Sequence, residues 1–148
     1  MGIKRIACLL LLMVLFLTCL HAQVKPVKRT IHHNLTGLSV ARGKIVYKSI
    51  CLACHMADGG GVPTMNPPLI KTDYVLGDKT RLIKIVLNGF KEDVEINGQT
   101  FSNNMTPHSD LTDRQIADVL TCVRKSFGNR ATGVTAFEVK KVRAANTK

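Results

Sequence analysis

Cys51-Leu52-Ala53-Cys54-His55 is the stretch of sequence that decides the fold. The pattern C-x-x-C-H is the attachment signature of c-type haem. Two thiols three positions apart on a helical turn can each form a thioether with one vinyl group of a haem. The His that follows directly then lies under the iron as its proximal ligand. The motif therefore predicts one covalently bound haem c, held by Cys51, Cys54 and His55.

Three other uses of a Cys-x-x-Cys pair fit this chain less well. A zinc site needs a second Cys/His pair at ligand spacing, whereas Cys122 stands alone. A thioredoxin-like redox pair needs a βαβ context, but this motif follows a helical pattern and precedes a loop rich in Gly and Pro. A disulfide between Cys51 and Cys54 would close a strained ring. Haem attachment is the interpretation that these residues favour.

Residues 1–22 are typical of a secretory signal peptide. Lys4 and Arg5 form a basic start, and Ile6 to Leu20 is an apolar run broken by one Thr. The alternative is an uncleaved membrane anchor, but a span needs roughly 20 apolar residues, which is more than this run has. We therefore expect cleavage before Gln23 and export to the periplasm or beyond. Membrane association is expected only through an uncleaved anchor.

The composition limits the size and the partners of the protein. The chain has 148 residues, enough for one domain, with 45% apolar residues and a formal charge of +11. Without residues 1–22, it keeps 19 basic and 10 acidic residues, a charge of +9, and three cysteines. Three cysteines cannot all pair within one exported chain. The sequence shows no nucleic-acid-binding module. The charge is either that of an ordinary solvated, Lys-rich surface or steers the protein toward redox partners with acidic docking surfaces, which are the partners we expect.

The remaining sequence predicts a mostly α-helical domain over residues 39–148, preceded by a loosely structured basic extension over residues 23–38. A helix is predicted from Ser39 to about Cys51, and a loop over residues 57–68. A helix capped by Asp78 and ended by Asn88-Gly89 follows, and then a β-hairpin over residues 94–101 that turns at Asn97-Gly98. The last two elements are a helix opened by the capping box of Thr112 and Gln115 and running to Gly128, and a short helix around Phe137, Val139 and Val142.

The iron needs a second axial ligand or has an open site. The candidates are Met56, Met65, Met105, His32, His33 and His108. Met56 is adjacent to His55 and cannot reach the opposite face of the haem, and Met65 is in the loop on the His side. Two of the histidines lie in the basic extension, and the third is expected to be a surface or structural residue. Met105 comes 50 residues after His55, which lets the chain wrap around the haem, so we favour Met105.

These features resemble the class I cytochrome c family over about residues 39–143. The matching residues are Gly43 and Tyr47 ahead of the C-x-x-C-H motif, Asp58-Gly59-Gly60-Gly61, Pro67-Pro68-Leu69, Met105 and the last predicted helix. The resemblance implies that helices wrap around one haem and that the first helix crosses the family's last helix, here the one opened by Thr112, at a small residue such as Gly43. It also implies that the carbonyl of Pro67 accepts a hydrogen bond from the proximal His55, which fixes the ring.

The sequence departs from this family in two places and adds a distinctive ending. The usual Met-Pro is Met105-Thr106-Pro107 here, and Cys122 stands where an aromatic residue is usual, so we expect a buried small thiol there. The ending, formed by residues 124–129 and 139–143, resembles that of small cytochrome domains that accompany quinoprotein dehydrogenases and some copper nitrite reductases.

A His/Met-ligated iron has both axial positions filled, so the sequence predicts a carrier of single electrons and not an enzyme. The residues expected to pack against the haem are Leu69, Leu82, Ile85, Val86, Phe101 and Ile116. Two alternatives remain open. If Met105 does not ligate, the protein is an open-site haem protein that binds small ligands or acts like a peroxidase. If it is permanently docked, it is a fixed electron-transfer subunit of a dehydrogenase.

Overall fold

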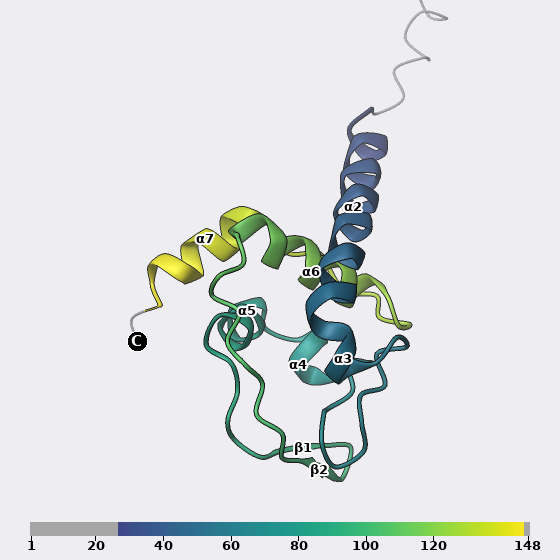
Figure 1. Ribbon diagram of the computed structural model, residues 1–148. Coiled ribbons are helices and arrows are strands. Elements are labelled where there is room, and N and C mark those ends of the chain that lie inside the picture. Colours follow the sequence, from purple (N-terminus) through teal and green to yellow (C-terminus); the bar gives the residue numbers. More distant parts are fainter. Residues whose placement is uncertain (1–26, 147–148) are drawn as a thin grey trace, which may run out of the picture. The chain divides into compact units, whose positions relative to one another are not determined.

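The computed structural model describes residues 27–146, with side chains from Leu35 onward (Figure 1). The chain divides into two compact units between Asn34 and Leu35. Of the first unit, only residues 27–34 are described, and they form the first turns of helix α2 (Val27–Val46). The predicted signal peptide lies outside the described residues. The second unit is mostly helical with one small two-stranded sheet, which confirms the predicted fold class.

The first helix is longer than the sequence predicts. α2 continues through a π-helical turn, η2 (Tyr47–Cys51), into the short helix α3 (Leu52–His55). The prediction of a loose extension before Ser39 is therefore wrong for residues 27–38. Hydrophobic periodicity marks only the residues that face the core, whereas a formed helix propagates readily through a stretch without proline. Ile45, within the predicted helix, is 68% exposed.

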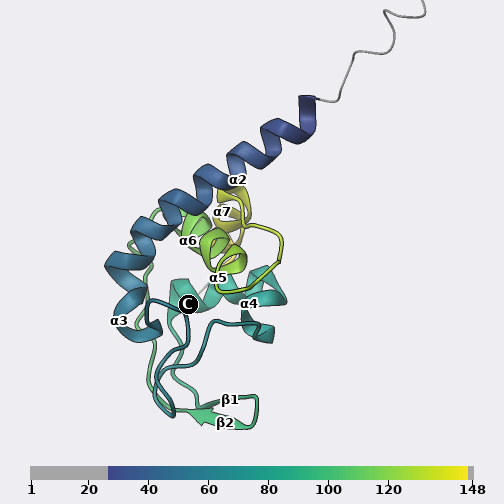
Figure 2. The same ribbon diagram turned by 90° about the vertical axis from the view of Figure 1, so that its right-hand side faces the viewer.

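Within the second unit, α2 crosses α6 (Asp113–Lys125) at Gly43, as the resemblance implies (Figure 2). A Cβ atom at Gly43 would lie 2.7 Å from the Cβ of Cys122 and closer still to the carbonyl oxygen of Asp118. The buried carboxylate of Asp118 accepts hydrogen bonds from Arg42 Nε at 2.6 Å and from Ser39 Oγ at 2.5 Å. The close crossing and these hydrogen bonds fix where α2 contacts α6.

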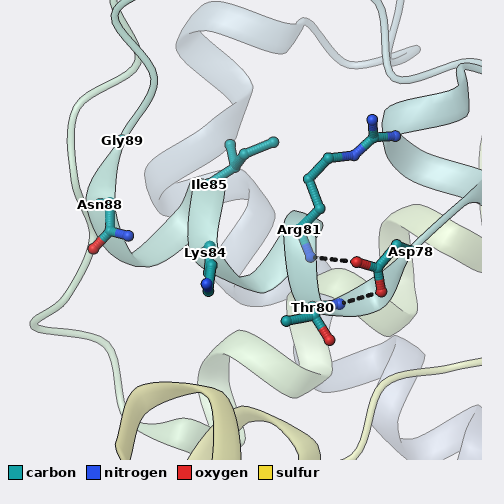
Figure 3. A pocket seen from close by; sticks show the side chains of 7 residues that line it. All are labelled: Asp78, Thr80, Arg81, Lys84, Ile85, Asn88 and Gly89. Carbon is teal, nitrogen blue, oxygen red and sulfur yellow. Dashed lines mark hydrogen bonds between the residues drawn. The ribbon is translucent and has the colours of Figure 1, made fainter. Parts of the chain in front are cut away.

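Two short helices and the hairpin follow the C-x-x-C-H motif. They are α4 (Asp73–Leu76), α5 (Lys79–Asn88), β1 (Val94–Ile96) and β2 (Gln99–Phe101). The carboxylate of Asp78 accepts hydrogen bonds from the backbone N–H groups of Thr80 and Arg81, which confirms the predicted cap of α5 (Figure 3). The strands pair antiparallel across Asn97-Gly98, and both turn residues have the positive φ that a type I′ turn needs. The hairpin prediction is therefore confirmed.

The C-terminal part consists of α6 and α7 (Ala136–Ala144), and each begins with a capping box. The box of Thr112 and Gln115 at α6 was predicted, and Thr135 and Glu138 form a second one at α7. α7 packs against both α5 and α6. The ion pair Lys79–Glu138 at 2.9 Å links α7 to α5, and Arg143–Asp113 at 2.7 Å links it to α6. α7 thus covers one side of the α5–α6 pair.

One hydrophobic core joins α4, α5, α6 and α7 to Tyr47. Ile83, Ile116 and Val139 are completely buried in it. None of the helices between residues 27 and 146 combines the length and the apolar character that crossing a membrane requires.

Candidate functional site

A cavity of about 260 Å³ brings the predicted site residues together. All six of them line it: Cys51, Cys54, His55, Pro67, Leu69 and Met105. Leu82, Ile85 and Val86 also line it as predicted, whereas Phe101 and Ile116 are buried elsewhere. Ile116 does not line the cavity, whereas Val119 and Leu120, one turn further along α6, and Val123, two turns further, do.

The two thiols of the motif differ in their surroundings. Cys51, at the end of η2, is half-buried, and Cys54, in α3, is exposed. Burial raises the pKa of the Cys51 thiol to about 11, and the neighbouring sulfurs of Cys122 and Cys54 add to the rise. A thiol-exchange pair needs a thiol pKa below the ordinary value, so this environment does not suit a thioredoxin-like role.

The ring of His55 is held by one backbone contact. Its Nδ1 lies 3.0 Å from the carbonyl oxygen of Pro67. A carbonyl can only accept, so Nδ1 carries the proton and Nε2 keeps its lone pair. Burial lowers the pKa of His55, although the Pro67 carbonyl partly opposes this shift. Burial favours the neutral imidazole and the Pro67 carbonyl fixes its tautomer, so Nε2 is free, which is the form that binds a metal.

A hydrogen-bonded loop returns the chain from His55 to Pro67. The backbone N–H of Gly61 donates to the carbonyl of His55 at 3.2 Å, and that of Leu69 donates to the carbonyl of Gly59 at 2.7 Å. Gly61 has a φ of +70°, and a Cβ atom there would lie 2.7 Å from the Pro67 carbonyl oxygen. The loop therefore needs glycine at this position to bring the Pro67 carbonyl to the imidazole.

Met105 reaches the cavity from a separate segment of the chain. Phe90 and Met105 form an antiparallel bridge with backbone hydrogen bonds of 3.0 and 2.8 Å. Gly89, at the end of α5, packs directly against the Met105 carbonyl, where a Cβ atom would clash. Met105 is half-buried and packs against the core. The end of α5 therefore fixes the backbone that carries this thioether.

The other candidate ligands are placed differently. Met56 and Met65 are exposed and do not line the cavity. The side chains of His32 and His33 lie outside the described ones. His108, expected to be a surface or structural residue, does line the cavity, and its backbone N–H donates to the carbonyl of Val86 at 2.9 Å. The residues around His108 in the sequence are polar, so no hydrophobic pattern indicated that His108 lines the cavity.

Sequence reasoning also missed two aromatic residues of the cavity wall, Tyr74 and Phe90. Their ring centroids are 6.0 Å apart in an edge-to-face arrangement. The guanidinium of Arg81 lies 4.4 Å from the centroid of the Tyr74 ring. Each aromatic lies outside a periodic helix pattern or at its edge, so hydrophobic periodicity could not assign it to the site.

The third thiol of the described region, Cys122, is buried beside the Gly43 crossing. Its Sγ lies 3.6 Å from Ser126 Oγ. This confirms the expected buried small side chain. Close by, the hydroxyl of Tyr47 donates to the carbonyl of Met56 at 2.7 Å, which ties the α2–η2 helix to the end of α3.

A second depression, of about 320 Å³, lies along α5 (Figure 3). It is lined by Asp78, Thr80, Arg81, Lys84, Ile85, Asn88 and Gly89. The Asp78 carboxylate is used by the helix cap, and Arg81 Nη2 donates to the carbonyl of Asp73 at 2.9 Å. These groups serve the local structure of α5 and do not converge on a common point. The cavity with the thiols and the imidazole is therefore the better candidate for chemistry.

The donor set and the lining of the cavity fit haem c. Two thiols and a neutral imidazole come from adjacent helical turns, and a thioether comes from the Met105 segment. Leucine, isoleucine, valine and proline side chains make up most of the wall. Such a wall suits a flat, largely apolar ring, and sulfur and imidazole ligands suit its iron.

Comparison with known proteins points to the same group. A family model described as Cytochrome c matches residues 40–126. The chain is 33% identical over 121 residues to a cytochrome c-552 of Thermus thermophilus, covering 74% of this chain and 81% of that protein.

Other relatives are subunits of larger assemblies. The chain is 35% identical over 111 residues to the cytochrome c subunit of the quinone alcohol dehydrogenase of Gluconacetobacter polyoxogenes, covering 68% of this chain and 22% of that protein. It is 31% identical over 116 residues to the fructose dehydrogenase cytochrome subunit of Gluconobacter japonicus, covering 75% of this chain and 24% of that protein. The chain thus spans about a fifth to a quarter of the length of these dehydrogenase subunits.

Proposed function

The chain belongs to the class I cytochrome c family and is an electron-transfer protein with covalently bound haem c, and we propose that it carries single electrons through one haem ligated by His55 and Met105. The observation that supports this most is the cavity that collects His55 from α3 and Met105 from a segment 50 residues later. A filled pair of axial positions leaves no site for a substrate.

The residues that would hold the haem have separate tasks. Cys51 and Cys54 would form the thioethers, His55 Nε2 and the Met105 sulfur would bind the iron, and the Pro67 carbonyl would keep the imidazole in one tautomer. When bound, the haem supplies a one-electron Fe(III)/Fe(II) couple. The apolar wall excludes water and disfavours the additional charge of the ferric state, and the Met thioether acts in the same direction.

We propose that the partners are redox proteins with acidic docking surfaces, one of them a dehydrogenase. The relatives that are cytochrome subunits of dehydrogenases support a dehydrogenase as the electron donor. The charge of +9 expected after removal of residues 1–22 supports electrostatic steering to acidic surfaces. Whether the protein diffuses or is a fixed subunit depends on the lifetime of that complex.

Export to the periplasm is the matching location. The basic start and apolar run of residues 1–22 have the form of a cleaved signal peptide. Haem is attached to C-x-x-C-H motifs outside the cytoplasm, so export and the motif support each other.

The test is the visible absorption and magnetic circular dichroism of the purified holoprotein, oxidised and reduced, beside Met105→Ala. We expect a low-spin spectrum with the charge-transfer band of a Met-to-ferric-iron bond, and loss of that band in Met105→Ala. Met65→Ala is the matched control because Met65 is exposed and lies outside the cavity lining. It should leave the band unchanged.

Two results would overturn the proposed ligation. A high-spin spectrum of the wild type would indicate an open site and a binder of small ligands or peroxide. A low-spin spectrum that is indifferent to Met105→Ala but lost in His108→Ala would make His108 the second ligand, since this residue also lines the cavity. Absence of covalent haem would contradict haem attachment at Cys51 and Cys54.

A further inference from the structure

The outer side of α2 carries an exposed apolar stripe, formed by Leu35, Leu38, Ala41 and Ile45. These residues are three, three and four positions apart, so they lie on adjacent turns of one helix face. Leu35, Leu38 and Ile45 are 59%, 57% and 68% exposed, and Ala41 is exposed as well. Isolated exposed leucines need no explanation, but a row of aliphatic side chains along one helix face indicates an interaction surface.

The helix that carries the α2 stripe has no acidic residue. The sequence from Gln23 to Met56 contains no Asp and no Glu. Arg42 is neutralised by Asp118 on α6. Lys44 and Lys48 are exposed and make no hydrogen bond or ion pair with any described residue. Lys44 and Lys48 follow Ala41 and Ile45 by three positions, so two uncompensated positive charges lie along one edge of the α2 stripe.

The residue types distinguish between the possible occupants of this surface. A second copy of the chain would bring the same lysines against each other, which disfavours a dimer at the α2 stripe. Protein–protein interfaces are enriched in aromatic residues and Arg and depleted in Lys, and the stripe has neither an aromatic residue nor an unpaired Arg. Aliphatic residues flanked by Lys are typical of helices that lie in the surface of an anionic bilayer, where lysine stems extend to the headgroups.

We propose that the outer face of α2 binds the surface of an anionic membrane, with the α2 stripe embedded at the headgroup boundary and Lys44 and Lys48 contacting lipid phosphates. This contact does not depend on how the haem is ligated. It has a consequence for electron transfer, because α2 leads through η2 into α3, where Leu52 and Cys54 are exposed. A membrane-bound redox partner would therefore meet the cytochrome close to its haem attachment helix.

The test is flotation of the holoprotein with vesicles made of equal parts phosphatidylglycerol and phosphatidylcholine, and with phosphatidylcholine vesicles. We expect binding to the anionic vesicles only, and its loss at about 1 M salt, where the Debye length falls to about 3 Å. The double variant L38S/I45S should lower the partition coefficient about tenfold by removing apolar area. K44Q/K48Q should lower it about tenfold by removing charge.

Matched controls on α7 distinguish vesicle binding through the α2 stripe from nonspecific binding. Phe137 is 76% exposed, and Lys140 and Lys141 are exposed beside it, so F137S and K140Q/K141Q make the same kinds of change elsewhere. Both should bind like the wild type, and the visible spectrum reports that every variant keeps its haem. Equal binding to neutral vesicles, equal loss in the α7 controls, or no binding to anionic vesicles would each overturn the proposal.

Discussion

Gly43 on α2 faces the backbone carbonyl of Asp118 on α6 so closely that no Cβ atom fits between them. Gly43→Ala gains helix propensity but must push the two helices apart, so we expect a net loss of roughly 2–3 kcal/mol in the free energy of unfolding. Urea unfolding of the holoprotein measures it. Gly37→Ala is the control on the same helix, since nothing lies within 4 Å of its added Cβ, and it should be neutral or stabilise by up to about 1 kcal/mol. Equal stabilities would contradict the close crossing.

The buried Asp118 carboxylate gives the crossing a pH dependence. Burial alone would raise its pKa, but the hydrogen bonds from Arg42 and Ser39 and the charges of Arg42 and Arg114 outweigh burial and hold the pKa below its usual value. A carboxyl group with a lowered pKa in the folded state stabilises above its unfolded pKa of about 4, and this stability is lost as the pH falls through the folded pKa. We expect Asp118→Asn to cost roughly 2 kcal/mol near pH 7. Unfolding titrations should show the difference from wild type closing below about pH 4, and a difference that stays constant with pH would refute this origin.

The Pro67 carbonyl reaches His55 only because Gly61 allows it. Gly61→Ala places a Cβ atom against the backbone of the loop, so we expect the hydrogen bond from His55 Nδ1 to the Pro67 carbonyl to lengthen. The imidazole should then donate its Nε2 electron pair to the iron less strongly. The reduction potential should then rise, and spectroelectrochemical titration measures it. Gly98→Ala has a similar positive φ but open space around the added Cβ. It should cost roughly 1 kcal/mol of stability without moving the potential. A shift of the same size in both variants would show that the potential does not report on this hydrogen bond.

The parts of the fold that local rules control were predictable from the sequence. The Asp78 cap, the Asn97-Gly98 turn and the Thr112 capping box each depend on a few adjacent residues, and each is confirmed. The attachment motif is equally local. The early start of α2 was missed because residues 27–38 have no core-facing pattern, and helix propagation does not require one.

The cavity wall was harder to predict, because side chains from distant segments form it. Ile116 has perfect helical periodicity with Val119 and Val123, yet it faces the core and not the cavity. Periodicity identifies a buried face but does not say which of two neighbouring volumes each residue fills. His108 and Tyr74 were missed for the complementary reason. They line the cavity from loop or helix-end positions that carry no periodic signal.

Arg124 is a second buried charge, besides Asp118, that the sequence did not reveal. Its guanidinium donates to the carbonyls of Val75, Gly77 and Thr132, and thereby joins α6 to the end of α4. Burial lowers the pKa of Arg124, but an arginine stays charged at neutral pH. Arg124→Met would leave these carbonyls without a donor, so we expect a loss of roughly 3 kcal/mol in the free energy of unfolding.

Two further variants show what Arg124 contributes. Arg124→Lys keeps the charge but cannot span all of these carbonyls, so its loss should be intermediate. Lys125→Met, on the exposed side of the same helix, should change stability by less than about 0.5 kcal/mol. Val75 and Val123 both line the cavity, so a weaker contact between α4 and α6 should also broaden the visible spectrum of the haem in Arg124→Met. If Arg124→Met were as stable as Lys125→Met, the carbonyls would have other donors, and the contact between α4 and α6 would not depend on Arg124.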